Sequence, residues 1–209
     1  MNISEEIVLI KDSKKGNLKA FELLVLNYQQ KIYNFALFFS EDQKRALDMC
    51  EDIFCDCFNN IKKYHKETPF LLWIYKTAIK KHVRIDGKLI GNMSNDINKK
   101  ETDYKEDLMS QIRISTNLLG PEDHDLRVAF TNAIIYCINK LDKHSKLFVV
   151  LKDFQNLSYT QIAGILNVES NIVKVAVIDA RKKFETVITK NKDLFLTKKF
   201  KLAGEFIYE

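Results

Sequence analysis

The residues best suited to chemistry with another molecule lie in a basic and aromatic stretch, KKYHKETPFLLWIYKTAIKKHVR, which runs from Lys62 to Arg84. Cationic side chains neutralise phosphates, and aromatic faces stack on unpaired bases with about 1–3 kcal/mol each, so the stretch favours single-stranded or melted nucleic acid. The polar loop 62–68 has little packing to do, and there we favour nucleic-acid contact. For Phe70 and Trp73 a core role is the stronger interpretation. The candidate contacts are Lys62, Lys63, Tyr64, His65, Lys66, Trp73, Lys76, Lys80 and Arg84.

A second set of chemically active residues is acidic and falls on a predicted helix. Asp48, Asp52 and Asp56 follow one another at intervals of four, so they share one helix face, and Glu51 lies beside them. A charged face is usually only solvated, but this pattern is equally compatible with a contact surface for a basic partner.

A third set of residues, within 154–184, has the pattern of a helix-turn-helix. Ser158 and Gln161 have the spacing of a capping box that starts a helix. Asn167 falls at the turn, where a left-handed backbone is needed and Asn tolerates it. Ser170 can cap the second helix. This geometry presents a helix to the major groove of DNA; the alternative is a helical hairpin in any all-α core.

The composition limits the elements that can position these residues. Six glycines and two prolines among 209 residues, with long apolar periodic runs, predict an all-α fold. The net charge of +5 permits an acidic partner without identifying one. The four cysteines do not form two pairs with the spacing of zinc ligands. We therefore expect reduced core cysteines in a cytosolic protein.

The chain shows no sign of export or of catalysis. Its first residues lack the basic start and apolar run of a signal peptide, and no apolar run approaches the roughly 20 residues of a membrane span. There is no Gly-rich phosphate loop, no catalytic-triad signature, and the four histidines are scattered. We therefore expect a soluble cytoplasmic protein that is not an enzyme, with no cofactor and no metal.

The helical patterns fall into two blocks separated by a polar stretch that is rich in Asn, Lys and Asp. We interpret that stretch as a flexible linker between two small helical domains, the second of which contains the helix-turn-helix. In the first block Asn17 is a possible cap, Thr68 should cap the fourth helix, and Pro69 should occupy its first turn. The predicted domains are 1–88 and 125–190, with a linker at 89–124 and a tail at 191–209; the predicted helices cover 4–11, 18–39, 41–62, a helix from 69 onward, 125–140, 144–154, 159–166 and 170–188.

In their order along the chain, which is the acidic helix, the basic and aromatic stretch and the helix-turn-helix, the three sets resemble a bacterial RNA polymerase sigma factor of the two-domain, extracytoplasmic-function type. The resemblance covers nearly the whole chain apart from the linker and the tail. RALDMCEDIFCDCF resembles the family's core-binding helix, which meets the clamp coiled coil of the β′ subunit, with matching positions at Asp48, Glu51, Asp52 and Phe54. TPFLLWIYKTA resembles the region for the promoter −10 element, where the preceding loop captures a flipped-out base in the family.

The segment from Leu141 to Lys174 resembles the family's −35-reading domain. Common family arginines fall here on Ala176 and Asp179, so few base contacts remain. Phosphate contacts are the expected role of Arg181, Lys182 and Lys183. The −35 candidates are Ser158, Tyr159, Ser170, Asn171, Lys174, Ile178, Arg181 and Lys182. Lys80 and Arg84 stand where the family usually has Asn and Asp, and Asn156 and Asn167 stand in place of Gly.

The resemblance implies a sigma factor that binds the β′ and β subunits of core RNA polymerase and promoter DNA at transcription initiation, without membrane insertion. An anti-sigma factor is implied by the family alone. The alternatives are a helix-turn-helix transcription regulator that acts without core polymerase, and a sigma-like decoy held by a protein partner.

Overall fold

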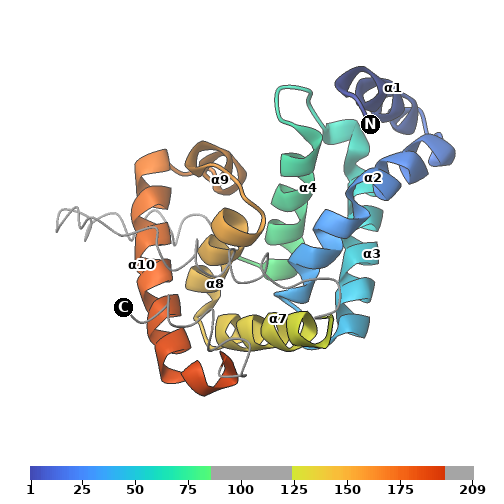
Figure 1. Cartoon of the computed structure of the whole chain (residues 1–209). Coiled ribbons are helices and arrows are strands. Elements are labelled where there is room, and N and C mark those ends of the chain that lie inside the picture. Colours follow the sequence, from blue (N-terminus) through green and yellow to red (C-terminus); the bar gives the residue numbers. More distant parts are fainter. Residues whose placement is uncertain (86–123, 196–209) are drawn as a thin grey trace. The chain divides into compact units, whose positions relative to one another are not determined.

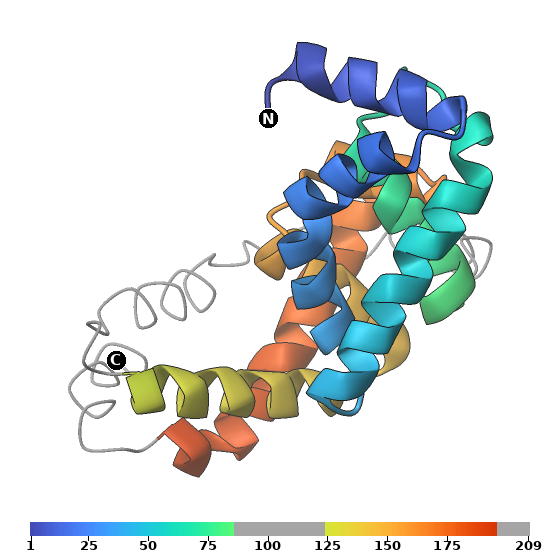
Figure 2. The ribbon, with the colours of Figure 1, turned by 90° about the vertical axis from the view of Figure 1, so that its right-hand side faces the viewer.

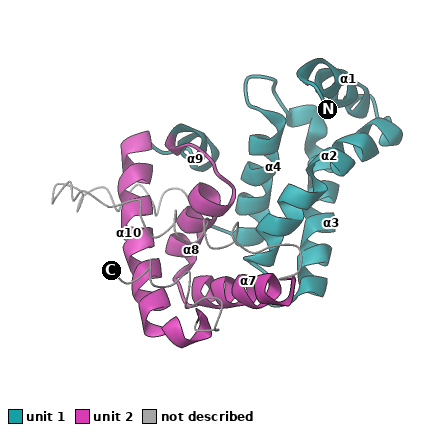
Figure 3. Ribbon diagram, in the orientation of Figure 1, with its two compact units in different colours: residues 1–91, 160–168 teal, residues 92–159, 169–209 magenta. Residues whose placement is uncertain are grey.

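The computed structural model describes residues 1–85 and 124–195 of the chain. All regular elements in these two ranges are helices, so the all-α prediction is confirmed (Figure 1). The backbone contacts divide the chain into one unit of residues 1–91 and 160–168 and another of 92–159 and 169–209 (Figure 3). The grouping of 160–168 with the first unit differs from the predicted second domain, 125–190. The predicted linker, apart from its last residue, and most of the predicted tail lie outside the described residues.

The first unit is built around the long helix α2. Helix α1 crosses one end of α2, and α3 runs alongside it (Figure 2). Leu24, Ile32 and Phe35 of α2 are almost completely buried, and the ring of Phe35 packs in a tilted arrangement against Tyr75 of α4, with 5.4 Å between the ring centroids. The elements of this unit are α1 (Ile3–Lys14), α2 (Leu18–Leu37), α3 (Gln43–Asn60), the 3₁₀ turn η1 (Ile61–Lys63), α4 (Phe70–Ala78), the π turn η2 (Ile79–Val83) and α9 (Tyr159–Leu166).

Short polar side chains fix where the first helices begin. Asn2 accepts from the backbone N–H of Glu5 at 2.8 Å, and the Glu5 carboxylate accepts from the N–H of Asn2 at 3.0 Å, which completes a capping box. The predicted cap at Asn17 is confirmed, because its side chain accepts from the N–H of Ala20 at 3.2 Å. Gly16 separates the two helices with a φ of +92°, which only glycine adopts without strain.

The second unit packs α8 against the long helix α10. Leu147, Phe148 and Leu151 from the α8 side and Phe184 from α10 are almost completely buried. Asp142 caps α8, since its carboxylate accepts from the N–H groups of two residues in the first turn. The elements are α7 (His124–Asn139), α8 (Lys143–Val149), the π turn η5 (Val150–Phe154), α10 (Ser170–Lys190) and the 3₁₀ turn η6 (Lys192–Phe195).

Two predicted helix caps are wrong. Helix α4 is preceded directly by Pro69 in the cap position, so Thr68 lies outside the helix and makes no cap. Ser170 is already the first helical residue of α10, after Glu169 in the cap position, and neither cap position is closed by a side-chain hydrogen bond. A capping side chain belongs to the residue just before the helix, whose backbone is not helical. Ser170 is already part of the helix and therefore cannot cap α10.

Among the described helices, none is by itself long and apolar enough to cross a membrane, although α9 and α10 taken as a bent pair pass the same test of length and composition.

Candidate polymerase and nucleic-acid interface

The acidic side chains of α3 divide into an exposed set and a paired one. Asp48, Glu51 and Asp52 are exposed, as a contact surface requires. Asp56, one turn further on, instead forms an ion pair with Lys81, and its other oxygen lies 3.0 Å from Nε2 of His82. The hydrogen bond from Lys81, followed by the one from His82, lowers the pKa of Asp56 although burial opposes the charge. Asp56 therefore stabilises the first unit and is not part of a free acidic face.

An open groove of about 790 Å³ lies between α2 and α3 beside this acidic set. Phe21 and Phe58 pack in its wall with their ring centroids 5.0 Å apart, while Leu47 is 52% exposed at the surface. Phe54, predicted as a contact, is only 7% exposed and lines the same groove. A partner can therefore reach Phe54 by entering the groove. Leu47 is not among the contacts predicted from the sequence, although an apolar residue next to charged ones could have indicated it.

The basic loop before α4 exposes its cations but not its tyrosine. Lys62, Lys63, His65 and Lys66 are exposed. Tyr64 is only 5% exposed, so its predicted role in base stacking is wrong.

The burial of Tyr64 follows from the rings around it. Its ring centroid lies 5.2 Å from that of Phe70 and 5.5 Å from that of Trp73, both in edge-on packing. Lys14 donates to the Tyr64 carbonyl at 2.6 Å and lies over its ring. Tyr64 thus anchors the loop from inside, and the half-buried Trp73 is the aromatic that retains an accessible surface next to it.

Three further predicted contacts follow on α4 and η2. Lys76, Lys80 and Arg84 are all exposed. Arg84 adopts a left-handed backbone with φ 54°, and its N–H donates to the carbonyl of Ile79 at 2.8 Å, which closes the π turn. The side chain of Arg84 is therefore placed by an unusual backbone and not by the regular helix period.

The turn after α9 has the predicted local geometry. The helix begins at Tyr159, as expected, and Asn167 adopts the left-handed backbone with φ 56°. The N–H of Val168 donates to the carbonyl of Ala163 at 3.1 Å, which satisfies an end carbonyl of the helix. The prediction of a left-handed Asn at this turn is confirmed.

The predicted −35 contacts differ in their exposure. Ser158, Asn171, Lys174 and Lys182 are exposed, and the side chain of Lys152 lies over the ring of the half-buried Tyr159 at 4.9 Å. Ser170 and Ile178 are half-buried.

Arg181 is 6% exposed and makes a bidentate ion pair with Asp153, so the phosphate contact predicted for it is wrong. Its guanidinium is directed into the second unit by this carboxylate. Lys183 also bonds within the unit, to Asp179 at 2.8 Å and to Asp142 at 3.3 Å.

The cysteines are free thiols, and burial suppresses the reactivity of three of them. Burial raises the pKa of Cys50 and Cys137 to about 11 and that of Cys57 to about 12. Cys55 is exposed, so the expectation of a core position is wrong for this residue. Within residues 1–85 and 124–195, no three His, Cys, Asp or Glu side chains gather in a way that could hold a metal ion.

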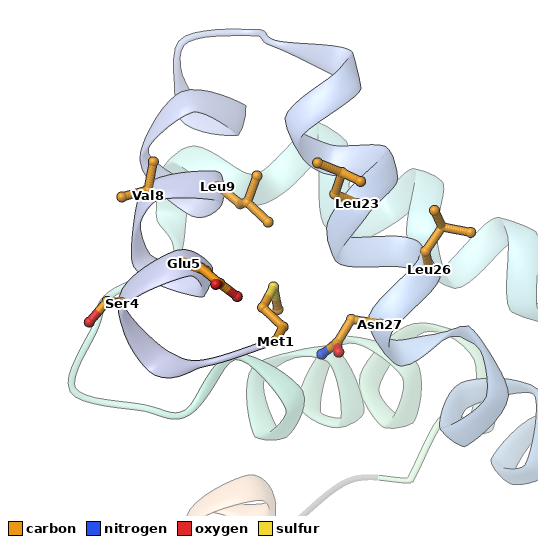
Figure 4. A pocket seen from close by; sticks show the side chains of 8 residues that line it. All are labelled: Met1, Ser4, Glu5, Val8, Leu9, Leu23, Leu26 and Asn27. Atoms are coloured by element: carbon orange, nitrogen blue, oxygen red, sulfur yellow. The ribbon is translucent and has the colours of Figure 1, made fainter.

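A second apolar groove, of about 740 Å³, lies between α1 and α2 (Figure 4). Val8, Leu23 and Leu26 line it and are each more than half exposed. Its polar lining includes the Glu5 carboxylate, which also takes part in the α1 capping box. The sequence indicates this surface only indirectly, because α2 carries apolar residues around most of its circumference.

No family model matches the chain. Several curated relatives align with most of its length. The RNA polymerase sigma-H factor of Pseudomonas aeruginosa is 24% identical over 183 residues, which cover 86% of this chain and 92% of the relative. The ECF RNA polymerase sigma factor SigW of Bacillus subtilis is 28% identical over 182 residues, with coverage of 83% and 91%. The ECF RNA polymerase sigma-E factor of Escherichia coli is 23% identical over 184 residues, with coverage of 87% and 93%.

Solved structures show the same fold. CnrH, solved in complex with the cytosolic domain of CnrY, gives a TM-score of 0.61 at 16% identity and covers 90% of this chain and 99% of that one. The sigma factor RpoE of Bartonella quintana, solved with the anti-sigma factor NepR, gives 0.55 at 14% identity and covers 82% and 98%. The curated relatives, together with this fold, confirm the resemblance of the chain to RNA polymerase sigma factors of the extracytoplasmic-function type.

Proposed function

We propose that this chain binds core RNA polymerase and directs it to promoters at transcription initiation. One observation carries the proposal: α3, whose sequence matches the family's core-binding helix, exposes Asp48, Glu51 and Asp52 beside the open groove between α2 and α3. Collinear similarity to proteins named sigma factors, over more than four fifths of the chain, favours this role over that of a regulator without polymerase.

The first unit docks on the polymerase and holds the melted −10 strand. The groove accepts an apolar partner surface while the acidic set meets basic residues around it, and complementary charge at such a rim accelerates association. The exposed cations of the loop 62–68 neutralise the strand's phosphates, and Trp73 is the aromatic for base stacking.

The −35 duplex is read by the α10 segment. Asn171 and Lys174 are exposed near the start of this helix, where a recognition helix contacts base edges. Lys182 is exposed further along the helix and suits a phosphate contact. Residues 1–88 and 125–190 correspond to the core- and −10-binding part and to the −35-binding part.

This role consists of binding and requires no covalent chemistry by the chain. The chain acts in the cytoplasm, where core polymerase and promoter DNA are found. Its partners are the β′ and β subunits, the promoter and a regulatory anti-sigma factor, a kind of partner with which RpoE of Bartonella quintana was solved.

Run-off transcription with core polymerase and genomic fragments tests the proposal. The wild-type chain should support promoter-dependent transcripts. The double variant Asp48→Lys/Asp52→Lys should lose at least about tenfold in polymerase affinity, or about 1.4 kcal/mol. Glu22→Lys, a charge reversal at an exposed position of α2 outside the groove lining, is the matched control. The absence of promoter-dependent transcripts from every fragment would overturn the proposed function.

A further inference from the structure

We propose that Arg181 and Asp153 are positioning residues that set the orientation of α10, so that −35 selectivity depends on a pair that does not touch DNA. This inference rests on the proposed function and deepens it. It assigns to Arg181 a role different from the phosphate contact that its sequence position suggests.

Arg181 and Asp153 form a bidentate ion pair, in which the planar guanidinium faces the planar carboxylate. Nε of Arg181 donates to Oδ2 of Asp153 at 3.1 Å, and Nη2 donates to Oδ1 at 2.5 Å. The two side chains are 7% and 0% exposed. Two parallel bonds between planar groups fix both distance and angle, which a single bond or an apolar contact does not.

The energetics favour orientation over stability as the role of this pair. Removing both charges from water costs about as much as their attraction returns, so a buried ion pair often adds little net stability compared with apolar residues of similar volume. An apolar pair, however, does not fix the angle between the two side chains. Asp153 lies in the π turn η5 and Arg181 lies midway along α10, so the pair defines the rotation of α10 about its own axis relative to η5.

This rotation reaches the DNA-contact candidates because α10 is one continuous helix. Lys174 precedes Arg181 by seven residues, which is close to two full turns, so both lie on the same side of the helix about 10 Å apart along its axis. A side-chain tip lies roughly 5–6 Å from the axis, so a rotation of about 20° moves it by about 2 Å. That displacement is enough to break a hydrogen bond to a base edge.

The neighbouring contacts of α10 with α8 are not equivalent to this pair. Lys183 lies 3.3 Å from both Asp142 and Ser145, but its side chain is 47% exposed. Exposed ion pairs are weak and adaptable. The buried pair therefore carries the orientation.

The salt dependence of duplex binding separates positioning from phosphate contact. Each lost phosphate contact reduces the slope of log affinity against log salt by about 0.9. The probe is a duplex that the wild-type full-length chain selects from a randomised pool, compared with a scrambled duplex over a series of KCl concentrations. Binding is measured without polymerase, so failure of this inference is distinguishable from failure to support transcription.

The double variant Asp153→Leu/Arg181→Met should keep the wild-type salt slope but lose about tenfold in the ratio of selected to scrambled affinity. Arg181→Lys keeps the charge but cannot form the bidentate pair, so it should lower the ratio of selected to scrambled affinity by a smaller factor. This variant also tests the inference if the double variant does not fold. Lys182→Met should lower the slope by about one while keeping the ratio. A slope lowered by about one in the Arg181 variants, or a fully retained ratio, would overturn the inference.

Discussion

The hydroxyl of Tyr64 donates a hydrogen bond to the backbone carbonyl of Thr68 at 2.8 Å and so closes the exposed basic loop between η1 and α4 from inside. The ring is held at the same time by Phe70 and Trp73. His65 and Lys66 lie between Tyr64 and Thr68 and are therefore presented on a backbone whose two ends are joined by one buried side chain.

Tyr64→Phe should loosen this loop without emptying the core. The ring is retained, and the lost hydrogen bond should lower the free energy of unfolding by about 1 kcal/mol, as measured by urea denaturation. Promoter melting, followed by the reactivity of unpaired thymines, should fall in parallel. Tyr136→Phe, at a 44% exposed position of α7, is the control and should leave both quantities unchanged. Equal behaviour of the two variants would contradict the anchoring role.

A comparison of Leu47→Asp with Leu23→Asp should show which of the two apolar grooves of the first unit binds core polymerase. Leu47 lines the groove between α2 and α3, and Leu23 lines the groove between α1 and α2; both are 52% exposed. Either substitution should change the unfolding free energy by less than about 0.5 kcal/mol, because neither residue is in the core. Leu47→Asp should weaken co-purification with core polymerase at least about tenfold, whereas Leu23→Asp should not. Loss of polymerase binding in Leu23→Asp alone would move the docking surface to the other groove.

The cap of α8 should make the second unit sensitive to acid. Burial raises the pKa of Asp142, but hydrogen bonds from Ser145 and the ammonium of Lys183 outweigh it and lower that pKa to about 2. A carboxylate with a lowered folded pKa contributes stability that is complete above its unfolded pKa of about 3.9 and is lost as the pH falls toward 2.

The carboxylate of Asp142 is 51% exposed, so solvent screening reduces this contribution to about 1 kcal/mol. Asp142→Asn keeps an acceptor for the cap but removes the charge, and should be less stable than the wild type at pH 7 by that amount. The difference should disappear near pH 2 in chemical denaturation curves. Asp125→Asn, at the exposed start of α7, is the control and should show no such convergence. A difference that persists at pH 2 would show that the charge is not its cause.

The change in stability caused by a substitution of Asn167 should depend only on how well the new residue adopts the left-handed backbone. Asn167→Gly should match or exceed the thermal stability of the wild type, because glycine adopts a φ of 56° without strain. Asn167→Val should lose about 1–2 kcal/mol, since a β-branched side chain clashes in this region. Asn132→Val, at an exposed position within α7, provides a comparison at a helical backbone. Similar losses in the two valine variants would exclude backbone strain as the cause.

Local patterns in the sequence were sufficient to predict the helices and several of their ends. The cap at Asn17 and the turn at Asn167 depend on neighbouring residues only, and the apolar period of α2 identifies buried Leu24 and Ile32 directly. Such features can be predicted because the cause and the effect lie within one or two helical turns.

The surroundings of two functional candidates could not be predicted in the same way. Arg181 is buried because a carboxylate 28 residues earlier meets it, and Tyr64 is buried because Trp73 and Lys14 cover it. Both residues have types that suit nucleic-acid contact, and only their tertiary partners decide against it. The assignment of the remaining exposed candidates stays a prediction.

Helices α4 and α8 each pass into a π turn, which accommodates one more residue than a turn of α-helix. Deletion of one residue at the start of such a turn can restore α-helical geometry, but the side chains that follow within the turn then move back by one helical position, which is about 100° about the axis. In the first unit that rotation would carry Lys81 and His82 away from Asp56, and in the second it would carry Asp153 away from Arg181. Each ion pair therefore depends on the number of residues in its π turn as well as on the types of those residues.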